Sequence, residues 1–176
     1  MEMYTPEVMI SDEEIALRIE ALGQAITQDF ADEELVVICV LKGAFMFCSD
    51  LIKRINRPLS LEFISLSSYG DSTQSSGNVR LEMDITCNVE GKNVLIVEDI
   101  VDTGLTIQTL MAMLQLRNPK QVKLASLLFK PMKLKHKVKI DYLGFEIEDK
   151  FVIGYGLDYA GRYRELPYIG VLNAGN

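Results

Sequence analysis

The stretch at residues 94–106, with the sequence VLIVEDIVDTGLT, constrains the fold of this chain more than any other feature. Its four consecutive apolar residues at 94–97 are typical of a parallel strand that is covered on both faces. Residues 106–117 have the pattern of a helix that follows the strand. A buried strand followed by a helix is the repeating unit of an α/β fold, so the stretch predicts that class.

The turn between this strand and this helix is suited to holding a phosphate. Thr103, Gly104 and Thr106 would offer backbone N–H groups and two hydroxyls at a helix N-terminus, where the dipole favours an anion. Three acids stand beside the turn, namely Glu98, Asp99 and Asp102. They would repel a phosphate unless hydroxyls or a cation lay between, and a ribose diol with Mg²⁺ meets that need. The implied ligand is therefore a ribose 5-phosphate that carries further phosphates.

The length and composition of the chain indicate a single domain. A chain of 176 residues, 48% of them hydrophobic, predicts a single domain over residues 1–176. The formal net charge of −7 argues against a nucleic-acid surface, which needs excess basic charge. Neither a signal-peptide pattern nor a run of 18 apolar residues is present, so we expect an untargeted protein without a membrane anchor. Cys39, Cys48 and Cys87 lack C-x-x-C spacing and are interpreted as reduced thiols in a cytoplasmic protein.

Helical and strand patterns alternate along the chain. Ser11 and Glu14 form a capping-box pattern, and apolar residues at 15, 19, 22 and 26 predict an opening helix. A second helix is expected at 44–55. Strands are expected at 34–41, 61–67, 80–86, 94–97, 121–129, 142–147 and 151–155. This order predicts a mostly parallel sheet with an antiparallel hairpin near 65–86, and a ligand site beyond the carboxyl ends of its strands.

Two segments interrupt the alternation. Residues 69–80 form a long polar stretch, which is typical of a functional or a disordered loop, and we interpret it as a moving lid. In residues 130–139 lysines alternate with other residues, which favours an edge strand with charged gatekeepers over a polyanion-binding surface. His136, the only histidine, is interpreted as a surface residue rather than a ligand.

The segment at 94–106 resembles the phosphoribosyl-diphosphate motif of the type I phosphoribosyltransferases. Three further segments, in the same order along the chain, narrow the resemblance to the hypoxanthine-guanine phosphoribosyltransferases. The segment that resembles their diphosphate-binding loop consists of Leu41, Lys42 and Gly43. The segment that resembles their mobile catalytic loop consists of Ser68, Tyr69 and Gly70. Lys130 together with residues 150–159, KFVIGYGLDY, resembles their purine pocket.

The resemblance implies the type I phosphoribosyltransferase fold, a mostly parallel central sheet flanked by helices with a small hood region. It implies a purine salvage enzyme that transfers 5-phosphoribosyl from phosphoribosyl diphosphate to a 6-oxopurine and releases diphosphate. Mg²⁺ would be the cofactor, the protein would form a homodimer or homotetramer, and neither nucleic acid nor membrane would be a partner. A cis peptide bond between Leu41 and Lys42 is also implied.

The same resemblance assigns a role to each candidate site residue. The catalytic group would comprise Asp102 as general base, Lys130, Tyr69 and Arg164. Diphosphate would be bound by Leu41, Lys42, Gly43, Ser68 and Arg164. The ribose 5-phosphate would be bound by Glu98, Asp99, Asp102, Thr103, Gly104, Leu105 and Thr106. The purine would be bound by Lys130, Phe151, Val152 and Asp158, and the metal by Glu98, Asp99 and Asp158.

Simpler interpretations stand beside these roles. Asp102 is also placed to be a helix N-cap, and Lys130 before Pro131 to be a solvated lysine that ends a strand. Leu105 departs from relatives that have a lysine there, so phosphate binding would rest on N–H groups and hydroxyls. The competing functions are phosphoribosyl transfer to xanthine, adenine or a pyrimidine, and a regulator that binds RNA or DNA. The preference between hypoxanthine and guanine stays open.

Overall fold

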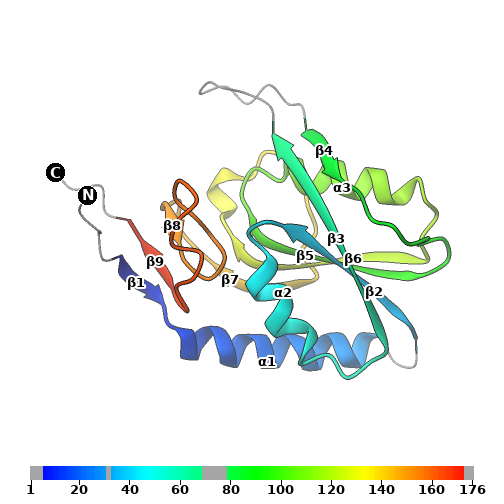
Figure 1. The fold of residues 1–176 in the computed structure, drawn as a ribbon, viewed down its shortest axis with the longest axis horizontal. Coiled ribbons are helices and arrows are strands. Elements are labelled where there is room, and N and C mark those ends of the chain that lie inside the picture. The colour runs from blue at the N-terminus through cyan, green and yellow to red at the C-terminus, as the bar shows by residue number, and fades with distance from the viewer. Residues whose placement is uncertain (1–5, 31–32, 69–78, 173–176) are drawn as a thin grey trace.

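The computed structural model describes residues 6–30, 33–68 and 79–172, and its centre is a six-stranded sheet (Figure 1). The strand order is β4-β3-β2-β5-β6-β7. All neighbouring strands are parallel except β3 and β4, which form the antiparallel hairpin predicted near residues 65–86. The bounds are β2 (Leu35–Leu41), β3 (Leu59–Ser68), β4 (Val79–Met83), β5 (Asn93–Val101), β6 (Gln121–Phe129) and β7 (Tyr142–Glu146).

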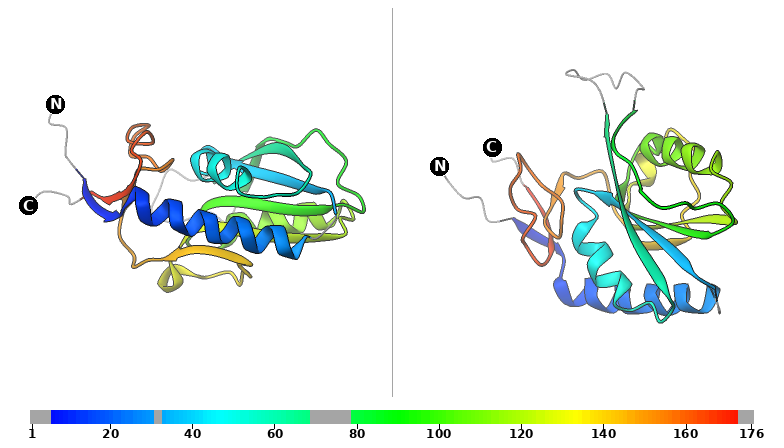
Figure 2. Two further views of the ribbon diagram at one scale, coloured as in Figure 1. Left: turned by 90° about the horizontal axis from the view of Figure 1, so that it is seen from below. Right: turned by 45° about the vertical axis from the view of Figure 1, so that its right-hand side comes forward.

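Helices cover both faces of this sheet (Figure 2). Helices α1 (Asp12–Asp29) and α2 (Phe45–Ile52) pack on one face, and α3 (Leu105–Gln115) packs on the other. Along β5, Leu95 and Val97 belong to the first core, whereas Val94 and Ile96 belong to the second. This alternation explains the unbroken apolar run, because both faces of a central parallel strand are buried. No helix in the described ranges is long and apolar enough to span a membrane.

Helix α1 begins as predicted. The Glu14 backbone N–H donates to Ser11 Oγ at 3.2 Å, and the Ser11 N–H donates to Glu14 Oε2 at 2.8 Å, which completes the capping box. The predicted apolar face is buried at Ile15, Ile19, Leu22 and Ile26. The three cysteines are free: Cys39 and Cys48 are buried, and Cys87 is half-buried.

A small antiparallel sheet stands beside the main one and forms the hood. Its order is β1 (Glu7–Ile10), β9 (Ile169–Val171) and β8 (Val152–Ile153). Ile10, Val152 and Ile169 belong to the same core cluster as Leu95, so the hood and the main sheet share one core. The α/β fold class with a hood is confirmed. Strands β1 and β9 were not predicted, and the strand expected at 151–155 is only the two residues of β8.

Four element predictions need correction. Strand β5 runs to Val101 because Glu98 pairs with Ser126 and Val101 with Phe129, so Glu98 and Asp99 lie inside the strand rather than after it. The predicted strand at 80–86 ends at Met83, and the helix at 44–55 ends at Ile52. The lysine-rich segment is not an edge strand. It consists of a short 3₁₀ helix, η1 (Pro131–Lys133), followed by irregular chain up to residue 141.

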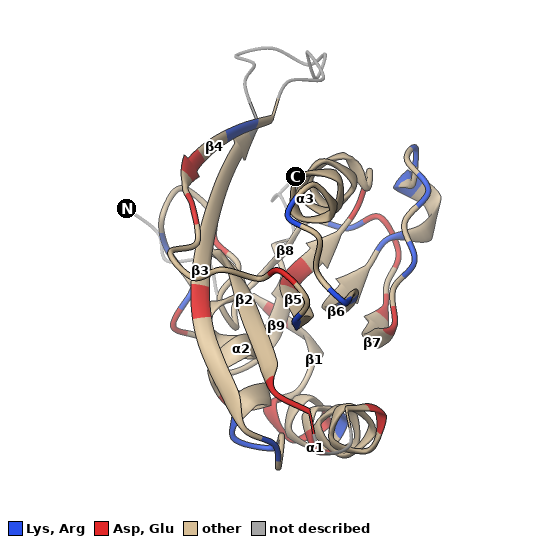
Figure 3. Ribbon diagram, turned by 90° about the vertical axis from the view of Figure 1, so that its right-hand side faces the viewer, with Lys and Arg blue, Asp and Glu red and all other residues tan. Residues whose placement is uncertain are grey.

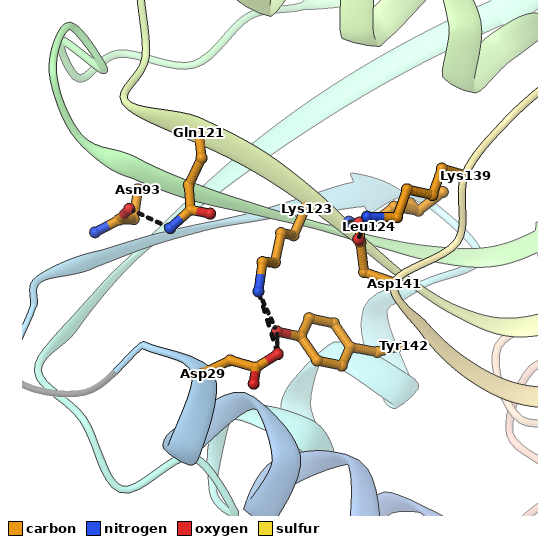
Figure 4. A network of polar contacts seen from close by, with 8 residues as sticks. All are labelled: Asp29, Asn93, Gln121, Lys123, Leu124, Lys139, Asp141 and Tyr142. Carbon is orange, nitrogen blue, oxygen red and sulfur yellow. Dashed lines mark hydrogen bonds and ion pairs between the residues drawn. The ribbon is translucent and has the colours of Figure 1, made fainter.

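Polar contacts at the starts of β5, β6 and β7 hold the sheet together (Figure 4). The Tyr142 hydroxyl donates to Asp29 Oδ2 at 2.6 Å, and Lys123 Nζ lies 3.1 Å from the same oxygen. These two contacts hold the pKa of Asp29 below its usual value, because both favour the carboxylate. This network lies at the amino ends of the strands, so the opposite, carboxyl ends are left to form a site.

Candidate active site

A cavity of about 310 Å³ lies at the carboxyl ends of β2 and β5. Its lining comprises residues 40–43, Leu66, residues 98–102, Gly104, Thr106 and Ile107. The two segments predicted to bind diphosphate and ribose phosphate therefore meet in one cavity. Figure 3 shows acidic residues on β5 and basic residues along the segment between β6 and β7.

Hydrogen bonds from the lysine-rich segment hold the turn at residues 102–106 in place. Gly104, the N-cap of α3, adopts a left-handed conformation with φ of 85° and makes no side-chain cap contact. The Thr103 carbonyl accepts from the N–H groups of Lys135 at 3.0 Å and His136 at 2.9 Å. These contacts help explain why the lysine-rich segment is not a strand, since two of its N–H groups bind the turn instead of a sheet partner. Asp102 is exposed and accepts from the Thr103 N–H at 2.5 Å, so its interpretation as the helix N-cap is wrong.

The acidic pair near the end of β5 is crowded, with Glu98 buried and Asp99 half-buried. Glu98 is 6% exposed, and burial, together with the charge of Asp99, raises its pKa well above the usual value. Burial also raises the pKa of Asp99, although hydrogen bonds and the nearby Arg164 charge oppose the shift. The Asp99 N–H donates to Glu98 Oε1 at 3.0 Å, and the Ile100 N–H donates to Asp99 Oδ1 at 2.7 Å. A cation or ligand hydroxyls beside this pair would stabilise its charged form.

Two glycines let the diphosphate-loop segment approach the acids. The peptide bond between Leu41 and Lys42 is cis, as the resemblance implied. A methyl group on Gly43 would overlap Asp99 Oδ2, and one on Gly156 would overlap the Gly43 carbonyl oxygen. Gly43 is therefore in direct contact with Asp99 and Gly156, and side chains at these two glycines would push the segments apart.

Arg164 links the hood to this contact. Its Nη1 donates to the Gly156 carbonyl at 2.5 Å, and its Nη2 lies 2.9 Å from Asp158 Oδ1. The other oxygen of Asp158 accepts from the Gly161 N–H at 2.8 Å. Both Asp158 oxygens are thus engaged. No group of three or more His, Cys, Asp or Glu side chains suited to a metal is present in the described part of the chain. A metal here would need oxygens from substrate and water.

Of the residues predicted to bind the purine, Lys130 lies directly after β6, and the others lie on or near the hood. Lys130 is 8% exposed, and its N–H donates to the Val101 carbonyl at 2.9 Å, so the interpretation as a solvated lysine is wrong. Val152 is buried. Phe151 is 54% exposed and meets the Tyr159 ring edge-on, with ring centres 5.7 Å apart. An exposed aromatic ring of this kind is available to stack on a base.

Sequence reasoning missed Asp149, whose Oδ1 lies 3.5 Å from Lys130 Nζ. The one available indication was that Asp149 stands directly before the segment at 150–159. Its pairing with Lys130, 19 positions away, has no local sequence pattern. Ser68 ends β3. Tyr69 and most of the expected lid lie outside the described residues.

The comparisons with known proteins agree with this geometry. The family model described as a phosphoribosyl transferase domain matches residues 9–160. A hypoxanthine-guanine phosphoribosyltransferase of Bacillus subtilis (strain 168) is 49% identical over 166 residues, which cover 94% of this chain and 92% of that protein. The enzyme of the same name from Dictyostelium discoideum is 51% identical over 170 residues, 94% of each chain.

Solved structures agree as well. A crystal structure of a hypoxanthine-guanine phosphoribosyltransferase from Bacillus anthracis superposes with a TM-score of 0.93 at 43% identity, over 97% of this chain and all of that one. A hypoxanthine phosphoribosyltransferase from Staphylococcus aureus superposes with a TM-score of 0.92 at 43% identity, over 95% of this chain and 91% of that one. The chain therefore belongs to the phosphoribosyltransferase family, within the group of the hypoxanthine-guanine phosphoribosyltransferases.

Proposed function

We propose that this protein is a purine salvage enzyme that transfers 5-phosphoribosyl from phosphoribosyl diphosphate to hypoxanthine, guanine or both, giving IMP or GMP and diphosphate. The observation that carries the proposal is the joint placement of the acidic pair, the phosphate turn and a buried lysine. Glu98 and Asp99 line the cavity, and the backbone of Lys130 is bonded to Val101, which lines the same cavity.

The difficulty of the reaction is charge, because the ribose becomes cationic and the leaving diphosphate becomes more negative as the C1–O bond breaks. Lys42 and the N–H groups beside it would stabilise the leaving group, together with Arg164. Glu98 and Asp99 would hold the ribose hydroxyls. Asp102, exposed at the cavity, would accept the proton from purine N7 as general base.

A magnesium ion fits the acidic pair. Mg²⁺ is commonly held by one or two carboxylates, with substrate phosphates and water completing its octahedron, and this cavity offers two adjacent carboxylates. When bound, the ion would neutralise charge on the diphosphate. Asp158 would contribute through water, since its oxygens already bind Arg164 and Gly161.

Lys130 supports the choice of a 6-oxopurine. An ammonium group has three donors and no acceptor, so it pairs with a 6-oxo group but faces the amino group of adenine with another donor. Phe151 would stack on the base, and the backbone of Val152 and Asp158 would face its 2-position. Tyr69 and Ser68 keep their predicted roles at the reacting ribose and the diphosphate.

Assembly and compartment are part of the proposal. Leu61, Phe63 and Met83 are exposed, and the alternation and register of β3 and β4 place them on one face, which supports a homodimer or homotetramer. The core shared by hood and sheet supports one domain over residues 1–176. The free thiols support a reducing, cytoplasmic setting.

Steady-state kinetics with hypoxanthine, guanine, xanthine and adenine test the proposal. Discrimination against adenine of about 10⁴-fold is expected where a buried donor is mismatched. Lys130→Ala should weaken hypoxanthine and guanine use together and narrow the gap to adenine, with the KM for phosphoribosyl diphosphate nearly unchanged. Lys137→Ala, at an exposed position on the same segment, is the control. A Lys130→Ala enzyme with wild-type rates and selectivity would contradict the assignment.

A further inference from the structure

The Asp149 carboxylate, two residues before Phe151 in the chain, lies close to two lysine ammonium groups. Asp149 Oδ1 lies 3.5 Å from Lys130 Nζ and 3.3 Å from Lys133 Nζ. The three side chains differ in burial: that of Lys130 is 9% exposed, whereas those of Asp149 and Lys133 are 47% and 43% exposed. The buried ammonium of Lys130 is thus paired with a carboxylate, that of Asp149, which is partly exposed to solvent.

This contact is what compensates the buried charge. Within the described ranges, Asp149 is the acidic residue that lies within 4.0 Å of the Lys130 ammonium. A buried ammonium without a partner is costly, and removal of one member of such a pair leaves the other charge uncompensated. The separation of 3.5 Å is at the long limit of a hydrogen bond, so Asp149 engages at most one of the three ammonium protons.

We propose that Asp149 is a positioning residue, which orients the Lys130 ammonium toward the 6-oxo group of the purine and thereby sets selectivity for 6-oxopurines. The inference rests on the proposed function, because it takes Lys130 as the group that contacts the purine. With one proton directed to Asp149, the other two remain available to the purine oxygen. Asp149 also stands two residues before Phe151, so one short segment places both the stacking ring and the partner of the lysine.

Lys133, the second lysine beside Asp149, would affect the carboxylate rather than contact the purine. A free carboxylate beside the base would accept a hydrogen bond from a 6-amino group and would favour adenine. The second ammonium lies 3.3 Å from Asp149 Oδ1 and makes this oxygen less available to such an amino group. Lys133 is itself half-exposed, so its removal leaves no buried charge behind.

The test compares variants in steady-state kinetics with hypoxanthine and adenine. Asp149→Ala should raise the KM for hypoxanthine about 10-fold or more, because a contact to a charged group is lost, while the KM for phosphoribosyl diphosphate stays within about twofold. Asp149→Asn keeps an acceptor oxygen and should recover part of the loss. Glu148→Gln, which alters a neighbouring acid that pairs with Lys150 on the surface, should match the wild type. Thermal unfolding of every variant identifies any that fail to fold, and Asp149→Asn then carries the test.

A double-mutant cycle separates positioning from a general structural effect. If Asp149 acts through Lys130, Asp149→Ala should add nothing to the hypoxanthine KM once Lys130→Ala is present. Additive effects of the two substitutions on the hypoxanthine KM would overturn the proposal. It would also be overturned if Lys130→Ala lost the selectivity for hypoxanthine over adenine while Asp149→Ala kept it. If Lys130→Ala itself keeps wild-type selectivity, the proposed contact of Lys130 with the purine is wrong. That outcome differs from one in which Lys130→Ala loses selectivity and only the role of Asp149 is wrong.

Discussion

Replacement of Gly104 by alanine should cost far more than an ordinary glycine substitution. Gly104 has a φ of 85° at the start of α3. A methyl group there would overlap the His136 carbonyl oxygen and would lie 3.0 Å from Val138 Cγ2 and 3.1 Å from Leu134 Cδ1. Gly91 has a φ of 70°, and a methyl group on it would meet nothing within 4 Å, so it is a matched control that carries the backbone strain alone.

The magnitude follows from adding the two costs. A left-handed conformation costs an alanine about 1–2 kcal/mol, and this applies to both positions. At Gly104 the segment at 134–138 must also withdraw, which breaks the contacts of Lys135 and His136 with the Thr103 carbonyl. Two such hydrogen bonds contribute about 1 kcal/mol each. We therefore expect a loss of about 3–4 kcal/mol for Gly104→Ala and about 1–2 kcal/mol for Gly91→Ala.

Urea unfolding and thermal melting measure this difference. For a chain of this size, a further loss of about 2 kcal/mol corresponds to a melting temperature about 4–8 °C below that of Gly91→Ala. Isothermal titration should show weaker phosphoribosyl-diphosphate binding for Gly104→Ala, because the phosphate turn is displaced, and unchanged binding for Gly91→Ala. Equal destabilisation of the two variants would refute the idea that the segment at 134–138 holds the turn.

Three other perturbations test the acidic groups of the site. Asp102→Asn should lower kcat by about 10² to 10⁴-fold while leaving phosphoribosyl-diphosphate affinity unchanged, and a loss of that affinity instead would indicate a structural role. Chelation of Mg²⁺ should abolish turnover, and full activity in excess chelator would exclude the metal role. The raised pKa of Glu98 means that the folded state holds this proton more tightly than the unfolded state, so its contribution to stability is present at acid pH and is lost as the pH rises through the raised pKa. Glu98→Gln should therefore gain stability relative to the ligand-free wild type as the pH rises, and a difference that stays constant between about pH 5 and 8 would contradict this reasoning.

Local patterns predicted the parts of the fold that local physics determines. The apolar run at 94–97 is buried on both faces in β5, and Ser11 and Glu14 cap α1 as their spacing indicated. The strand at 121–129 was predicted with the bounds that β6 has. In each case the pattern and its cause lie within a few residues of one another, as period, burial and capping require.

The missed features depend on partners far along the chain. Strand β1 pairs with β9, so Glu7 faces Val171, and strands of four and three residues have no reliable pattern of their own. The lysine-rich segment does alternate like a strand. Its N–H groups at Lys135 and His136 bind the Thr103 carbonyl instead, and Pro131 begins a 3₁₀ turn. A tertiary partner thus overrides the local pattern, as it also does for Asp149.

The most consequential difference concerns the acidic pair. The apolar run predicted a strand that ends at residue 97, with Glu98 and Asp99 directly after it. Pairing of β5 with β6 continues to Val101, so both acids are drawn into the sheet and Glu98 is buried. Burial disfavours their charged forms, whereas the proposed binding of a cation and the ribose hydroxyls would favour those forms. Gly43 lies directly against Asp99, because a methyl group on Gly43 would overlap Asp99 Oδ2. We therefore expect the binding of substrate and metal to favour the charged forms of the acids, which couples deprotonation of the acids to ligand binding.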